Sequence, residues 1–129
     1  LKGGSGERAI PTLLALRDNR NSYELALNIP NQGYISNLPT ECIVEVPASV
    51  SGFGVNGLSI GALPTAIAGL CNTHVYVAEL AVDAAITGDR SIALQALLAY
   101  PVINDIEIAE KILDDYLSAH AAWLPQFAA

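Results

Sequence analysis

Basic residues are scarce in this chain. Six lysines and arginines stand against thirteen aspartates and glutamates, which gives a formal net charge of −7 at pH 7. A surface that binds a nucleic-acid backbone or an anionic membrane needs clustered positive charge. The cations are scattered, although three lie near the first predicted helix, and we expect neither nucleic acid nor membrane as a partner. They are Lys2, Arg8, Arg17, Arg20, Arg90 and Lys111.

Long apolar runs are also missing. No stretch reaches the roughly 18–20 residues that a transmembrane helix requires. The first residues show no signal-peptide pattern, and we interpret residues 1–4 as an internal part of a longer protein.

Cysteine is rare, with only Cys42 and Cys71 in 129 residues. Two cysteines in a domain of this size make no disulfide framework. Both stand in apolar surroundings, so we interpret them as buried free thiols in a reducing compartment, which predicts a cytoplasmic protein.

Apolar residues, in contrast, are abundant. They make up 52% of the chain, against 15% charged residues. The length fits one domain with its own core, so we treat residues 1–129 as a single domain. The apolar excess, much of it alanine, indicates either a tightly packed helical core or a face that another part of a larger protein covers.

The pattern of elements predicts an α+β fold. A helix is expected over residues 5–18, in which Pro11 should either cost a hydrogen bond or lie in the first turn. Strands are expected over residues 23–29 and 43–46, with Tyr23, Leu25 and Leu27 on one side of the first strand. Residues 51–61 are expected to form a loop or hairpin, so the strands should pair antiparallel.

Three helices are expected to follow the strands. The first starts at Pro64 and stops at Gly88; Asp89 caps the second, which ends before Pro101. Asn104 and Glu107 resemble a capping box for the third, which ends near Pro125. The sequence thus predicts a small antiparallel sheet with three or more packed helices.

Residues that could carry chemistry each have a structural alternative. Cys71 and His74, at helical i, i+3 spacing, could reach one metal ion if Glu79 or Asp83 joined them, but a buried thiol beside a half-exposed histidine is the simpler interpretation. The carboxylates of Asp114 and Asp115 point about 100° apart on a helix, as on a solvated face.

Two further segments leave alternatives open. The glycine-rich residues 2–6 could bring backbone N–H groups to a phosphate or could be a linker. Asn28, Asn31 and Asn37 surround a turn, where asparagine usually serves the backbone, although amides could also bind sugar hydroxyls. The residues by themselves therefore indicate no self-contained active site.

Several motifs together resemble the C-terminal region of family-four glycoside hydrolases over nearly the whole chain. The most specific is an Asn-containing loop that ends in Leu-Pro and is followed by Val-Glu-Val-Pro. The matching segments are residues 28–39, 43–47, 61–64, 79–89, 93–98 and 119–127.

The resemblance implies an unusual glycosidase reaction. In this family a bound NAD⁺ oxidises the sugar 3-hydroxyl, a metal, usually manganese, polarises the ketone, and a tyrosine removes the proton at position 2. Elimination, addition of water and return of the hydride follow. The substrates are sugars or sugar phosphates.

The resemblance also places most of that machinery elsewhere. The Rossmann domain, the metal ligands and the tyrosine base lie upstream in the family, so residues 1–129 correspond to the substrate-side and oligomer-building domain. This domain resembles the C-terminal half of lactate and malate dehydrogenases. We expect no catalytic, NAD-binding or metal-binding residue in this chain. The candidates for substrate contact are Lys2, Asn28 and Asn31.

Two departures from the family pattern leave the substrate type open. Relatives often carry Arg-Gly-Gly and then Tyr-Ser where this chain has Lys2-Gly3-Gly4 and then Glu7-Arg8, and they often have Arg or Asn where it has Gln32. Three interpretations remain: a catalytically silent part of a homo-oligomeric glycosidase, a non-catalytic dimerisation domain, or a metal protein using Cys71 and His74.

Overall fold

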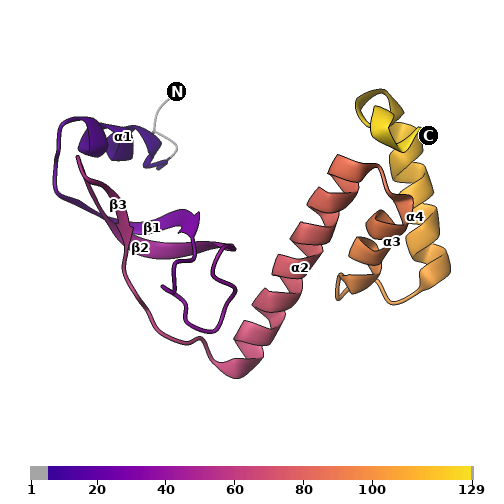
Figure 1. The fold of residues 1–129 in the computed structure, drawn as a ribbon, viewed down its shortest axis with the longest axis horizontal. Coiled ribbons are helices and arrows are strands. Elements are labelled where there is room, and N and C mark those ends of the chain that lie inside the picture. The colour runs from indigo at the N-terminus through magenta and orange to yellow at the C-terminus, as the bar shows by residue number, and fades with distance from the viewer. Residues whose placement is uncertain (1–5, 129) are drawn as a thin grey trace. The chain divides into compact units, whose positions relative to one another are not determined.

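A computed structural model describes residues 6–128 of the chain. The chain divides into two compact units, residues 1–64 and residues 65–129. Unit 1 holds one helix and a sheet, and unit 2 is helical (Figure 1). The predicted α+β class, with an antiparallel sheet and at least three helices, is confirmed.

Unit 1 consists of helix α1 (Ala9–Arg17) and the strands β1 (Ser22–Pro30), β2 (Ile43–Ser51) and β3 (Gly54–Gly57). The strands pair antiparallel in the order β1-β2-β3. Pro11 is the third residue of α1, where its missing N–H has no helical partner to lose. Helix α1 lies against β1 and β2 and buries Ala15.

The prediction that Tyr23 and Leu27 lie on one side of β1 was wrong, because Tyr23 pairs with the exposed Ser49 and Leu27 with the buried Val46. Tyr23 and Leu25 are exposed, whereas Glu24 is buried. The register with β2 shifts between Glu24 and Leu27. A β-bulge places an extra residue in one strand and so reverses which side chains face the core beyond it.

Strand β2 is longer than the predicted four residues and continues through Pro47. Alternate residues Val44, Val46, Ala48 and Val50 are buried, as expected of a strand with one face in the core. Pro47 accepts a hydrogen bond from the Leu58 N–H at 2.7 Å but has no N–H to return. Strand β3 accordingly ends at Gly57.

The core of unit 1 lies between the sheet and the loop that joins β1 to β2. Val44, Val46 and Ile35 form its buried centre. Partly buried side chains surround that centre: Ile29, Tyr34, Leu38, Cys42 and Leu63. Cys42 and Cys71 are both free, as predicted, but each is half-buried rather than fully buried.

Unit 2 contains the predicted three helices, α2 (Thr65–Thr87), α3 (Arg90–Ala99) and α4 (Ile106–Ala119), followed by the short 3-10 turns η1 (Ala121–Trp123) and η2 (Pro125–Phe127). The predicted cap at Asp89 is confirmed, because its carboxylate accepts from the N–H groups of Ser91 and Ile92. The predicted cap at Asn104 was wrong by one residue: Asp105 accepts from the Ile108 N–H.

The corner between α2 and α3 is constrained both by its own backbone and by a contact from the end of the chain. Gly88 has φ +71° and its N–H bonds to the Ala84 carbonyl. The Gln126 side chain donates to the Ala85 carbonyl at 2.7 Å, so the chain near its C-terminus is held against this corner. A Cβ on Gly88 would collide with the backbone of Gln126.

The substitution Gly88→Ala should therefore destabilise unit 2. The left-handed backbone costs an alanine about 1–2 kcal/mol, and the collision with Gln126 adds to that cost. Gly69→Ala is the matched control, because Gly69 lies inside α2 with open space around it; there the substitution should stabilise by about 0.5–1 kcal/mol. Thermal unfolding followed by circular dichroism measures the stability of both variants. A Gly88→Ala variant that melts at the temperature of wild type would contradict the role of Gly88.

Candidate functional site

The loop from residue 31 to residue 42 is organised by the side chain of Asn31. Asn31 is fully buried. Its amide nitrogen donates to the carbonyls of Ile35, Leu38 and Pro39 at 2.9–3.1 Å, and its oxygen accepts from the Ile35 N–H at 3.0 Å. Both amide hydrogens are thus engaged with backbone, which is the turn-forming role that sequence reasoning had left open for this residue.

A second amide fastens this loop to the segment before α2. Asn37 accepts from the Leu63 N–H at 2.9 Å and donates to the Leu63 carbonyl at 2.8 Å. Beside it, Ile35 and Gly61 form a parallel bridge and the Ile60 N–H donates to the Tyr34 carbonyl. Loop 31–42 therefore has a fixed shape, although it is neither helix nor strand.

Asn28, the second predicted contact residue, lies differently. It is exposed on β1 and is the direct partner of Glu45 on β2, which is exposed as well. Residues paired in this way point to the same face of a sheet. The amide of Asn28 and the carboxylate of Glu45 thus present donor and acceptor groups to solvent next to loop 31–42. Lys2 lies outside the described residues.

An ion pair between the largely exposed Arg8, just before α1, and the buried Glu24 on β1 was missed by sequence reasoning. The Arg8 guanidinium donates to both oxygens of Glu24, at 2.9 and 3.0 Å, and the Glu24 side chain is 3% exposed. Hydrogen bonding from Arg8 lowers the pKa of Glu24 below its ordinary value, against the opposing effect of burial. The same contact raises the pKa of Arg8.

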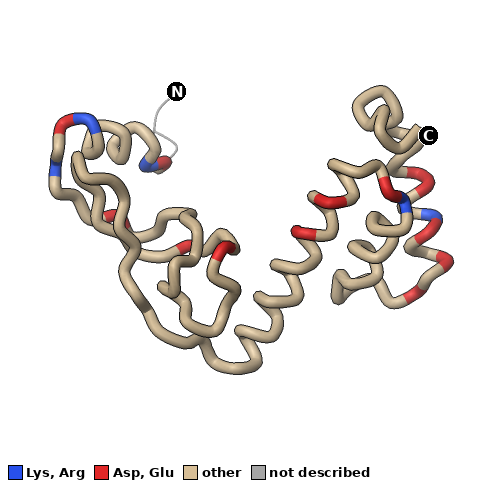
Figure 2. The backbone as a smooth tube through the Cα atoms, in the orientation of Figure 1, with Lys and Arg blue, Asp and Glu red and all other residues tan. Residues whose placement is uncertain are grey.

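The other arginines are paired with carboxylates too. Arg17 and Arg20 both contact Asp18 at 2.6 Å, and Arg90 contacts Asp114 at 2.6 Å between α3 and α4. Figure 2 shows that the cations of the described chain lie around α1 and beside α3 and α4. Asp114 therefore has an ion-pairing role on an exposed helix face.

Metal ligation was the other candidate chemistry. Within residues 6–128, no three His, Cys, Asp or Glu side chains gather closely enough to hold a metal ion. The ring of His74 instead makes an edge contact with Tyr100, with centroids 5.4 Å apart. The donor set of these residues does not fit a manganese or zinc site. No helix in this part of the chain is long and apolar enough to cross a membrane.

Comparison with known proteins assigns the chain to a family. Residues 1–103 match the model of the "Family 4 glycosyl hydrolase C-terminal domain". This chain belongs to that family. An alpha-galactosidase of Rhizobium meliloti (strain 1021) is 39% identical over 127 residues, covering 96% of this chain and 26% of the relative.

Solved structures agree with the sequence relatives. A 6-phospho-alpha-glucosidase from gut microorganisms, in complex with NAD and glucose-6-phosphate, matches with a TM-score of 0.87 and 30% identity, over 96% of this chain and 28% of that one. Another, in complex with NAD and Mn²⁺, matches with a TM-score of 0.89 and 25% identity, over 98% and 28%. The chain thus spans about a quarter of the length of the family 4 relatives it matches.

We predict that Asn31 stabilises this family 4 domain through its buried amide. Asn31→Ala would remove the amide that bonds three carbonyls and one N–H, at a cost of about 2–4 kcal/mol, although the Ile35 and Pro39 carbonyls keep a second donor. Asn28→Ala, the matched control on the exposed face of β1, should change stability by less than about 0.5 kcal/mol. Urea unfolding measures both; equal midpoints would contradict the structural role of Asn31.

The pair of Arg8 and Glu24 predicts a dependence of stability on pH. Because the pKa of Glu24 is lowered in the folded state, the ionised carboxylate stabilises the fold above its unfolded pKa, near 4.3. That contribution is lost as the pH falls through the lower, folded pKa. Glu24→Gln should therefore weaken the loss of stability below about pH 4 relative to wild type.

The control for this experiment is Glu45→Gln, the same change at an exposed position of the same sheet. Urea unfolding midpoints between about pH 2 and pH 7 compare the variants with wild type. Glu45→Gln should keep the acid-side slope of wild type. An unchanged slope in Glu24→Gln would mean that this ion pair does not set the acid stability.

Proposed function

We propose that this chain is the C-terminal domain of a longer, NAD- and metal-dependent glycosidase that hydrolyses O-glycosidic bonds. The observation that carries the proposal is the family 4 match over residues 1–103, together with relatives of which this chain spans about a quarter. The reaction class is oxidation, elimination, addition and reduction, on a sugar or sugar phosphate. The family resemblance supports that class, with NAD and Mn²⁺ as cofactors of the full-length protein.

In this proposal the 129 residues are catalytically silent alone. The described side chains gather no metal site, and the relatives that were solved with NAD and Mn²⁺ are chains of which this one covers 28%. The domain supplies shape and substrate contacts instead. Asn28 is proposed to contact the sugar, Asn31 to act in the same region by holding loop 31–42, and Lys2 to act from the segment before α1. The full protein is proposed to be a cytoplasmic homo-oligomer.

A second function remains a candidate: a non-catalytic dimerisation domain with the same fold. Many large apolar side chains of the described chain are exposed, including Ile10, Leu13, Leu25 and Trp123. Exposed apolar surface on this scale marks an interaction site. A stable assembly of the 129-residue chain without any other polypeptide would favour this alternative.

The enzymatic proposal predicts activity in the full-length protein, with NAD⁺ and Mn²⁺, on aryl glycosides of glucose, galactose, galacturonic acid, glucose 6-phosphate or galactose 6-phosphate. Removal of a proton at position 2 should place deuterium from D₂O at that carbon of the product, which mass spectrometry detects. The 129-residue chain should show no turnover. Activity that needs neither cofactor, or a product free of deuterium, would contradict the proposed reaction class.

Asn28→Ala tests the substrate contact within the active full-length enzyme. We expect a higher KM with an unchanged melting temperature, because the side chain is exposed and its loss leaves no buried group unpaired. Ser49→Ala serves as the control, an exposed polar position of the same sheet. Equal kinetics for Asn28→Ala, Ser49→Ala and wild type would remove Asn28 from the substrate site.

A further inference from the structure

Helix α2 is apolar over most of its circumference. Its 23 residues contain only two charged side chains, Glu79 and Asp83, which lie on one side. Only Ala68 and Ala84 are buried, whereas Leu70, Val82 and other large apolar side chains are exposed. A helix that is apolar nearly all round is normally enclosed by other elements. Unit 2 encloses one part of it.

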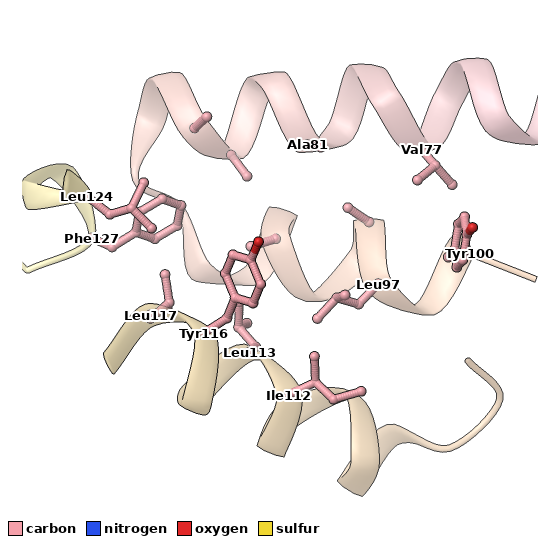
Figure 3. A pocket seen from close by; sticks show the side chains of 14 residues that line it. Val77, Ala81, Leu97, Tyr100, Ile112, Leu113, Tyr116, Leu117, Leu124 and Phe127 are labelled. Carbon is pink, nitrogen blue, oxygen red and sulfur yellow. The ribbon is translucent and has the colours of Figure 1, made fainter. Parts of the chain in front are cut away.

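An apolar groove runs along α2 within unit 2. Helix α3 packs against α2 on one side and against α4 on the other. Between these helices lies a groove of about 420 Å³, and its lining includes Phe127 of η2 and Leu124, the residue before η2. Figure 3 shows α2 and α4 on opposite sides of it, with the ring of Tyr116 pointing from α4 toward α2.

The groove walls are chemically uniform. None of the described side chains that line the groove carries a charge. On the α2 side the groove is lined by small side chains such as Ala81 and Ala85. On the α4 side it is lined by larger ones such as Ile112 and Tyr116. The charged residues of α4, such as Lys111 and Asp114, do not line the groove. The Tyr116 side of the groove is open, since this residue is 62% exposed.

These dimensions suit the apolar face of a helix. The α2 residues that line the groove run from Val77 to Ala85, which corresponds to about 12 Å, or two helical turns. Small residues on one helix let the backbone of another approach closely. A helix laid along α2 and α4 would complete a four-helix arrangement around one apolar core.

We propose that this groove holds an apolar helix from the part of the full-length glycosidase that lies outside these 129 residues. The inference rests on the proposed function. About three quarters of each family 4 relative lies outside the region that matches this chain, so the same polypeptide has ample length to supply the helix. A second copy fits less well, because a two-fold axis would bring groove against groove, and two concave surfaces leave each other unfilled.

Photo-crosslinking in the full-length protein tests the occupant. p-Benzoylphenylalanine replaces Tyr116 in one variant and Tyr76 in a matched control; Tyr76 is similarly exposed, at 54%, but lies on α2 away from the groove. The expected crosslink from position 116 joins a peptide outside residues 1–129 and migrates at the mass of one chain on a denaturing gel. The control variant, with the photoprobe at position 76, should not form that crosslink.

Thiol labelling provides the second measurement, in case the bulky photoprobe disturbs folding. Ala81→Cys should be protected from maleimide in the full-length protein, whereas Ala78→Cys, outside the groove lining, should react; wild type corrects for Cys42 and Cys71. A crosslink at twice the chain mass, a crosslink confined to residues 1–129, or equal labelling at both positions would each overturn the proposal. Glycosidase activity is measured separately, so failure of the groove proposal can be distinguished from failure of the proposed function on which it rests.

Discussion

The four hydrogen bonds of the Asn31 amide are the constraint on which unit 1 depends. A segment of twelve residues, 31–42, with neither helix nor strand must pack on the core face of the sheet while its backbone carbonyls stay paired. One buried side chain satisfies three of those carbonyls and one N–H. With the loop shaped in this way, Ile35 and Leu38 reach the core beside Val44 and Val46.

Unit 2 depends on a different kind of constraint. Its helices are joined through small residues, and the buried positions of α2 and α3 are alanines. Alanines allow close approach of helices but bury little surface each, so the apolar content of the chain is larger than its own core uses. Much of that content, including Ile67 on α2 and Ile108 on α4, remains on the surface. This distribution favours a domain that packs within a larger protein over one that is complete alone.

Sequence reasoning recovered the order of elements because each left a local signal. Pro64, Gly88 and Asp89 mark helix ends by their backbone chemistry, and their positions were predicted correctly. The bulge in β1 was not predictable, because it depends on pairing with β2 and no residue type in this segment indicates it. The partner of Glu24 was missed for a related reason: Arg8 lies sixteen residues away, and only the fold brings them together.

In the candidate site, too, some features have a local sequence signal and others depend on the fold. Asn28 and Asn31 are the same residue type three positions apart, yet one is exposed on a strand and the other is completely buried in a loop. Composition and spacing treat them alike, and only their hydrogen bonds separate a solvent-facing amide from a loop-forming one. The family was recognisable from longer motifs, because a run of residues that together build loop 31–42 carries more information than any single side chain.

The bond between Gln126 and the Ala85 carbonyl has a consequence for biosynthesis. The interactions described for unit 1 join residues within the first 64 positions. At the α2–α3 corner, in contrast, Ala85 bonds to Gln126, which lies 41 positions further along the chain. On a ribosome, which releases the chain from its N-terminal side, unit 1 can settle while unit 2 is still being made. The Gln126 contact with this corner can form only after residue 126 has emerged.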